Sequence, residues 1–168
     1  MANEPRDAEY ARSLVENRRY ADQFDRSKLP AQPARRLAVL ACMDARLVVE
    51  DALGLRAGDA NIIRNAGGLA SDDAIRSLII SQELLGTDTV IVIGHTGCGM
   101  ASFRDEAVSH GLAERTGVEV DLPLGAFDDL ELSVREQVER IRAHPWTKDV
   151  PVHGLVFETD TGRLREVV

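Results

Sequence analysis

Residues 37–42 read Leu37-Ala38-Val39-Leu40-Ala41-Cys42, an apolar run without a charged or hydroxyl side chain. A continuous run of this length is typical of a parallel β-strand that is buried on both faces. A second run, at residues 89–93, is β-branched throughout and predicts another buried strand. Residues 60–63 predict a third, shorter strand. These three strands are the expected centre of the fold.

Helical segments alternate with the strands. Residues 44–53 predict a short helix, and Ser71 predicts the N-cap of a longer helix that ends at Gly86. A further helical stretch follows the glycine-rich turn after the 89–93 strand, and residues 127–143 predict a late helix. This alternation predicts an α/β fold with a mostly parallel central sheet of strand order 2-1-3-4 and helices on both faces.

The two ends of the chain differ from this pattern. Residues 5–24 carry a narrow apolar stripe that predicts an amphipathic helix, and Pro30 and Pro33 mark an extended connector. We therefore expect one domain over residues 1–168 in which residues 1–33 form an N-terminal helical arm and connector. Such an arm packs either on a partner subunit or on its own domain. Residues 153–168 predict a C-terminal hairpin.

Composition excludes several classes of protein. The chain has 20 Lys and Arg against 28 Asp and Glu, a net charge of −8, whereas nucleic-acid binding needs a positive face. Apolar runs are far shorter than the roughly 20 residues of a membrane span. The polar N-terminus lacks the apolar stretch of a secretory signal, and two cysteines are too few for a disulfide framework. We expect a cytoplasmic enzyme or small-ligand binder with no nucleic-acid or membrane partner.

The carboxyl ends of the predicted strands carry metal-binding residue types. Cys42 ends the first strand, and His95 and Cys98 follow the strand at residues 89–93. Ligand sites in parallel sheets lie at these ends, where neighbouring strands bring their residues together. Taken singly, each residue is more often a core or loop residue. Together, two thiols and an imidazole favour zinc, and three protein ligands leave a fourth position open, as in catalytic zinc sites.

Asp44 and Arg46 follow Cys42 closely enough to pair with each other. A carboxylate held by a guanidinium stays ionised and only accepts hydrogen bonds. Beside zinc, Asp44 could orient a zinc-bound hydroxide, and the ion pair would keep the carboxylate off the metal. Two alternatives are an ordinary surface ion pair and a non-catalytic zinc protein with Asp44 as a permanent fourth ligand.

Two glycine-rich turns allow a different hypothesis. Residues 94–99 follow a strand and could hold phosphate on backbone amides, although they lack the G-x-G-x-x-G spacing and a Walker lysine. Residues 64–68 could form an anion-binding nest or a tight turn whose glycines permit close packing. A phosphate-binding module is therefore the weakest candidate.

The sequence resembles the β-class carbonic anhydrases, most closely their compact prokaryotic branch. The resemblance rests on residues 42–46, 64–67 and 94–99 and extends from about residue 36 to the C-terminal hairpin. It implies a zinc ion held by Cys42, His95 and Cys98, with Asp44 and Arg46 as the orienting dyad. The implied activity is that of a carbonate dehydratase, in which zinc-bound hydroxide reversibly hydrates carbon dioxide to bicarbonate and a proton.

The resemblance has further implications. Gly67, Ile80 and Gly99 fall at positions expected to line the substrate pocket. Family members are dimers or larger homo-oligomers, which implies that the N-terminal arm embraces a partner copy. The same scaffold also resembles hydrolases of carbonyl sulfide or carbon disulfide, so a sulfur substrate is the nearest alternative to carbon dioxide.

Overall fold

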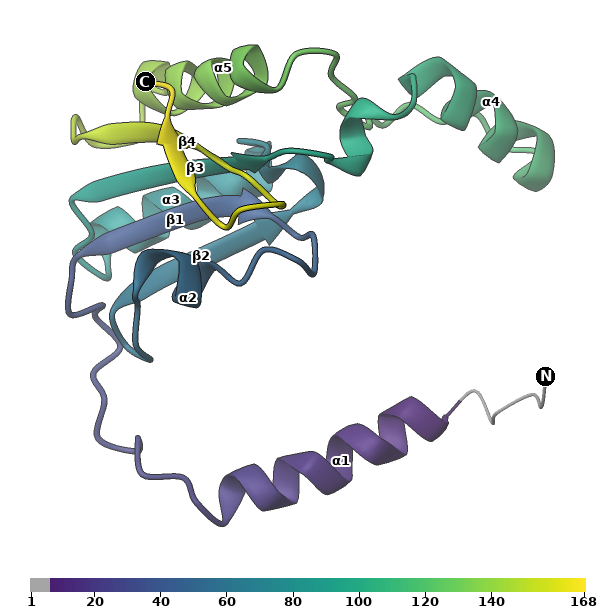
Figure 1. Ribbon diagram of the computed structural model, residues 1–168. Coiled ribbons are helices and arrows are strands. Elements are labelled where there is room, and N and C mark those ends of the chain that lie inside the picture. The colour runs from purple at the N-terminus through teal and green to yellow at the C-terminus, as the bar shows by residue number, and fades with distance from the viewer. Residues whose placement is uncertain (1–6) are drawn as a thin grey trace. The chain divides into compact units, whose positions relative to one another are not determined.

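The computed structural model describes residues 7–168 of a chain that divides into two compact units, Met1–Pro30 and Ala31–Val168. The first unit contains helix α1, Ala8–Ala21 (Figure 1), which buries none of its residues. The predicted helix spanned residues 5–24. Its first two positions lie outside the described residues, and its C-terminal end comes earlier because Asp22 caps the helix.

The second unit is built on a five-stranded sheet of order β2-β1-β3-β4-β5 (Figure 1). Strands β1 to β4 pair in parallel, and β5 pairs antiparallel with β4. Their bounds are Leu37–Cys42, Ala60–Asn65, Thr89–His95, Val152–Phe157 and Leu164–Glu166. The predicted fold class and strand order are therefore confirmed, and the hairpin adds the antiparallel edge.

Two strands are longer than their apolar runs. Strand β2 continues to Asn65, and strand β3 continues to His95. The ladder persists through these polar residues because Asn65 pairs with Cys42, and the Asn65 carbonyl accepts the N–H of Met43 at 2.8 Å. Backbone pairing therefore fixes the positions from which the polar side chains of the site project.

Helices cover both faces of the sheet, as predicted (Figure 1). Helices α3 (Asp72–Glu83) and α5 (Leu130–Ala143) share one apolar core with β1 and β3, and the short α2 (Val49–Leu53) shares the core of the other face. Ser71 caps α3, where its hydroxyl accepts the N–H of Ala74. The late helix begins at Leu130 rather than at residue 127 because Asp129 caps it.

The helix predicted over residues 44–53 is wrong in its first half. Residues 44–48 form a turn because the Asp44 carboxylate accepts the N–H of Arg46 at 2.9 Å and the Asp44 carbonyl accepts the N–H of Leu47. An aspartate that bonds to the backbone two residues on competes with helix formation. Only α2 remains helical, and Asp44 stays at the strand end.

Short 3-10 turns and one exposed helix complete the unit. The turns are η1 (Ala66–Gly68) and η2 (Gly99–Ala101), and helix α4 (Asp105–Thr116) buries none of its residues. Within residues 7–168, no helix has the length and apolar character needed to cross a membrane.

The packing of α5 on β4 gives a test of the fold. A Cβ atom at Gly154 would lie 2.7 Å from Val134 Cγ1 and 3.1 Å from Val138 Cγ2, both on buried side chains. We expect Gly154→Ala to lower the free energy of unfolding by about 1–3 kcal/mol, measured by urea denaturation.

Gly111→Ala is the control for this substitution, because Gly111 lies in α4 with no heavy atom within 4 Å of an added Cβ. Alanine is favoured over glycine inside a helix by up to about 1 kcal/mol, so this variant should be as stable as the parent or more so. A Gly154→Ala protein of unchanged stability would contradict the close approach of α5 to the sheet.

Candidate metal centre

The sheet brings together the three residues that the sequence marked as metal ligands. Cys42 is the last residue of β1, His95 is the last residue of β3, and Cys98 lies in the turn that follows. Their potential ligand atoms all lie within 4.8 Å of one another, and all three residues are buried. Within residues 7–168, they form the one such group of three or more metal-binding side chains. We call these three residues the ligand cluster.

The imidazole of His95 is oriented for metal binding. Its Nδ1 lies 3.0 Å from the carbonyl oxygen of Thr96, which can only accept, so Nδ1 carries the proton. Nε2 is then left with a free lone pair, and this atom is buried without a hydrogen-bond partner. Metal-binding histidines are typically held in this way, by a hydrogen bond from the nitrogen that does not bind the metal.

The two thiols are spaced as zinc ligands and not as a disulfide. Both cysteines are free, and Cys42 Sγ lies 3.9 Å from Cys98 Sγ. Two thiolates bound to one tetrahedral zinc at about 2.3 Å would be separated by about 3.8 Å, whereas a disulfide needs about 2.05 Å. Burial raises the pKa of the Cys98 thiol, so a cation is needed to stabilise its thiolate at neutral pH. The donor set and its geometry therefore fit zinc.

Asp44 and Arg46 form the ion pair that the sequence predicted. Arg46 donates from Nε to Asp44 Oδ1 at 2.9 Å and from a terminal nitrogen to Oδ2 at 2.8 Å. These bonds, with the Arg46 backbone N–H, hold the pKa of Asp44 well below its usual range. Asp44 Oδ2 lies 3.7 Å from His95 Nε2. An ionised carboxylate therefore stands beside the ligand cluster with both oxygens engaged by arginine.

Backbone carbonyls fix the guanidinium groups around the site. Arg46 also donates to the Gly97 carbonyl at 2.9 Å, which ties the β1 exit to the turn after β3. Arg64 donates to the carbonyls of Cys42 and Asp44 at 3.0 and 2.7 Å. This role of Arg64 was not predicted from the sequence. The position of Arg64 directly before Asn65, which pairs with Cys42, was a usable signal.

The glycine turns serve packing rather than phosphate binding. A Cβ at Gly68 would lie 3.0 Å from the Cys42 nitrogen, and the positive φ of Gly68 also favours glycine. Residues 64–68 therefore form a tight turn whose glycines permit close packing, and Arg64 donates its hydrogen bonds to backbone carbonyls of this chain. After residues 94–99, the chain enters a 3-10 turn of three residues, which offers no helix N-terminus to a phosphate.

Of the three residues expected in the substrate pocket, Gly67 and Gly99 lie in the two turns beside the ligand cluster, and Ile80 lies elsewhere. Gly67 is buried, and an added Cβ would lie 3.2 Å from Met100 Cγ. Gly99 follows Cys98 directly and has open space where a Cβ would be. Ile80 is exposed on α3 and lines a cavity of about 520 Å³ in which none of the ligand cluster takes part.

An apolar surface beside the thiols was missed from the sequence. Cys42 and Cys98 pack with buried Met100, and Phe103 and Phe127 pack against this group. We call Phe103 and Phe127 the aromatic wall. Neither residue lies in a helix or strand, so no hydrophobic periodicity could have identified it.

Comparisons with known proteins agree with this geometry. The sequence model of the carbonic anhydrase family matches residues 37–120, which include the whole ligand cluster. The chain is 42% identical over 155 residues to β-carbonic anhydrase 1 of Mycobacterium tuberculosis, covering 92% of this chain and 94% of that protein. It is 40% identical to a carbon disulfide hydrolase of Acidithiobacillus thiooxidans, covering 78% of this chain and 76% of that protein.

Structural similarity is equally extensive. The crystal structure of a carbonic anhydrase from Streptococcus mutans superposes with a TM-score of 0.90 at 40% identity, covering 95% of this chain and 97% of that chain. Similarity of sequence and fold over nearly the full chain, with a Cys-His-Cys cluster compatible with zinc, leads to one conclusion: this chain belongs to the β-carbonic anhydrase family.

Proposed function

We propose that this protein catalyses the reversible hydration of carbon dioxide to bicarbonate and a proton, with zinc held by Cys42, His95 and Cys98. The observation that carries the proposal is the unpartnered, buried Nε2 of His95 between two free thiols and beside an ionised carboxylate. Zinc in such a site supplies Lewis-acid chemistry that makes water a nucleophile near neutral pH.

Asp44 is proposed to orient the reacting water. Because Arg46 keeps it ionised, the carboxylate can accept a hydrogen bond but does not take up the proton. A water molecule beside the ligand cluster that donates to Asp44 has its lone pair turned away from the carboxylate and toward the substrate. Arg46 also keeps Asp44 from becoming a permanent metal ligand, which favours a catalytic site over a purely structural one.

The substrate is proposed to lie against Met100 and the aromatic wall. Carbon dioxide is linear and apolar, so it gains from leaving water for an apolar surface. Gly67 and Gly99 lie in the two turns beside the cluster, and we assign them a place at the substrate pocket. Carbon disulfide hydrolysis is not favoured, because the mycobacterial carbonic anhydrase sequence aligns with more of this chain than the carbon disulfide hydrolase sequence does. The Streptococcus mutans carbonic anhydrase also superposes with a higher TM-score, 0.90, than a carbon disulfide hydrolase structure, 0.73.

We further propose that the protein is a homodimer or a larger homo-oligomer of the cytoplasm. Helix α1 supports the oligomer, because it exposes the apolar side chains of Tyr10, Leu14 and Tyr20, which a partner copy could cover. The free thiols of Cys42 and Cys98 support the cytoplasmic location, because a reducing compartment keeps cysteines available to a metal.

Metal content tests the ligand assignment. We expect the purified, reduced protein to hold about one zinc ion per chain, because three ligands and an open position make a complete catalytic zinc site. His95→Ala should lose most of this zinc, measured by plasma mass spectrometry. His110→Ala is the matched control, because His110 is exposed on α4. Full zinc content in His95→Ala would show that the metal is bound elsewhere.

Asp44→Asn tests the orienting role. Asparagine keeps the shape of the side chain but loses its charge and one acceptor oxygen, so the reacting water is no longer held in one orientation. We expect unchanged zinc content and a fall in kcat/KM for carbon dioxide of roughly 10²-fold, measured by stopped-flow hydration. Asp51→Asn in α2 makes the same charge change at an exposed position and should keep parental activity. Parental kinetics in Asp44→Asn would refute the assigned role.

Substrate choice is tested on one zinc-loaded preparation. Carbon dioxide hydration and hydrogen sulfide release from carbon disulfide should be measured side by side. Fast hydration with negligible sulfide release is the expected result. Sulfide release that exceeds hydration would assign the protein to the hydrolases, and zinc without either activity would indicate a non-catalytic member of the family.

A further inference from the structure

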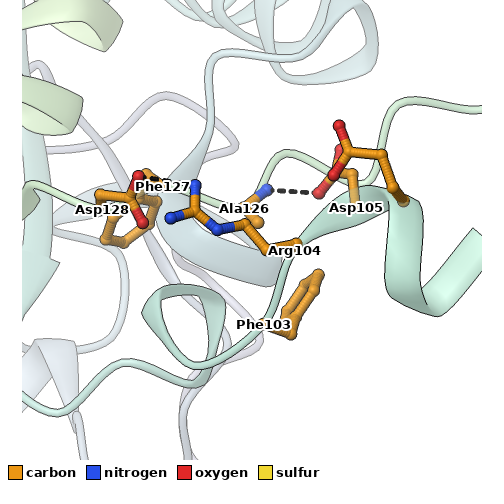
Figure 2. Close-up of a pocket in the computed structure, with 7 residues that line it drawn as sticks. Phe103, Arg104, Asp105, Ala126, Phe127 and Asp128 are labelled. Carbon is orange, nitrogen blue, oxygen red and sulfur yellow. Dashed lines mark hydrogen bonds and ion pairs between the residues drawn. The ribbon is translucent and has the colours of Figure 1, made fainter.

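The loop that carries Phe127 depends on one carboxylate. The chain between α4 and α5 has no helix or strand from residue 117 to residue 129. Asp105, the first residue of α4, accepts three backbone N–H groups from this loop: those of Leu124 and Gly125 at Oδ2 and that of Ala126 at Oδ1, at 2.8–2.9 Å. Figure 2 shows the carboxylate facing the Ala126 nitrogen.

These hydrogen bonds are strong, and few other polar contacts hold the loop. The N–H groups of Ala126, Gly125 and Leu124 lower the pKa of Asp105, so the acceptor is ionised at neutral pH and the bonds are charge-assisted. In the described structure, the other hydrogen bond to residues 119–127 runs from the Phe127 N–H to the Met100 carbonyl at 3.2 Å. Asp105 therefore supplies most of the polar contacts that hold this part of the loop.

The held segment meets the site through Phe127 and is packed against Leu69 at Gly125. Phe127 follows Ala126 directly and packs against the group of Cys42, Cys98 and Met100. Gly125 lies so close to Leu69 that an added Cβ would overlap Leu69 Cδ1. A small shift of residues 124–126 would therefore move Phe127 or collide with Leu69.

Phe127 and Phe103 also face open space. Together with Arg104, Asp105 and Asp128, they line a cavity of about 230 Å³ (Figure 2). The aromatic wall is thus shared between this cavity and the thiol side of the ligand cluster. Arg104 and Asp128 form an ion pair at 2.8 Å beside this cavity. Both side chains are more than two-thirds exposed, and exposed ion pairs stabilise a structure only slightly.

We infer that Asp105 is a positioning residue of the carbon dioxide site: it holds residues 124–126 so that Phe127 forms the apolar surface beside Cys42 and Cys98. This inference rests on the proposed function. Asp105 touches neither the ligand cluster nor the substrate, and it acts through Phe127. The resulting apolar surface selects a small, linear, apolar substrate by shape.

Asp105→Asn is the first test. Asparagine offers one acceptor oxygen in place of two, so at least one loop N–H loses its partner. We expect faster hydrogen–deuterium exchange at residues 124–126 in the zinc-loaded protein and a fall in kcat/KM for carbon dioxide of about ten-fold, the scale of a misfitted apolar pocket. kcat should change by a smaller factor because Asp44 and Arg46 are untouched, and zinc content should stay at the parental level.

Two controls separate positioning from general stability. Glu106→Gln removes the same charge from the neighbouring residue in the first turn of α4. Glu106 lines the same cavity as Asp105, but its side chain makes no hydrogen bond to the loop in the described structure, so this variant should leave exchange and kinetics unchanged. Gly154→Ala lowers stability at the contact of β4 with Val134 and Val138 of α5 and leaves the hydrogen bonds of Asp105 in place. If it reproduces the kcat/KM loss of Asp105→Asn, the loss reflects stability and the inference is overturned.

A double-substitution cycle tests whether Asp105 acts through Phe127. Phe127→Ala should itself lower kcat/KM, and Asp105→Asn added to it should cost less than about two-fold more, because coupled residues are not additive. A full ten-fold cost in the Phe127→Ala background would overturn the inference. If the parent protein has no hydration activity, the proposed function fails, while unchanged exchange at residues 124–126 in Asp105→Asn would separately refute the positioning role.

Discussion

The site depends on the parallel pairing of β1 with β3 at the centre of the sheet. Parallel neighbours end at the same edge, so Cys42 and His95 meet there although they lie 53 positions apart in the sequence. Buried strands hold both residues in place through the backbone pairing of β1 with β3. That convergence is costly, since it buries an unpartnered imidazole nitrogen beside two thiols. A zinc ion held by these three residues would offset this cost by giving each donor a partner.

The charges around the ligand cluster decide which groups can reach a metal ion. Besides the two cysteines, an ionised Asp44 stands close enough to be a further anionic ligand for a cation near His95 Nε2, since its Oδ2 lies 3.7 Å from that nitrogen. Arg46 competes with a cation for Asp44 by donating to both carboxylate oxygens. It also donates to the Gly97 carbonyl, which ties the guanidinium to the turn after β3. For Asp44 to bind the metal, several charge-assisted hydrogen bonds must break together. Arg46 would therefore hold Asp44 away from a bound metal ion.

The parts of the fold that were predictable are those encoded by local patterns. Strands β1 and β3 follow from their continuous apolar runs, and the ligand cluster follows from reactive residue types placed at the strand ends. The length of α2 was not predictable from helical pattern, because a single side-chain bond from Asp44 to the Arg46 N–H replaces its first turn. Phe127 and Asp105 meet only through a long loop, and no periodicity links them. Sequence patterns thus reveal the donors but not the apolar surface beside them.

The donors and the apolar surface beside them play different parts in substrate choice. Carbon dioxide and carbon disulfide are both linear and apolar, and the chemistry of a Cys-His-Cys zinc site can act on either. The donors therefore cannot discriminate between them, whereas the space in front of the donors can. The aromatic wall packs beside the thiols, and its Phe127 lies in the irregular segment between α4 and α5. Substitutions in this loop can change the available space without disturbing the strands that hold the donors. In the proposed site, the loop accordingly sets the space offered to the substrate, and the sheet sets the positions of the donors.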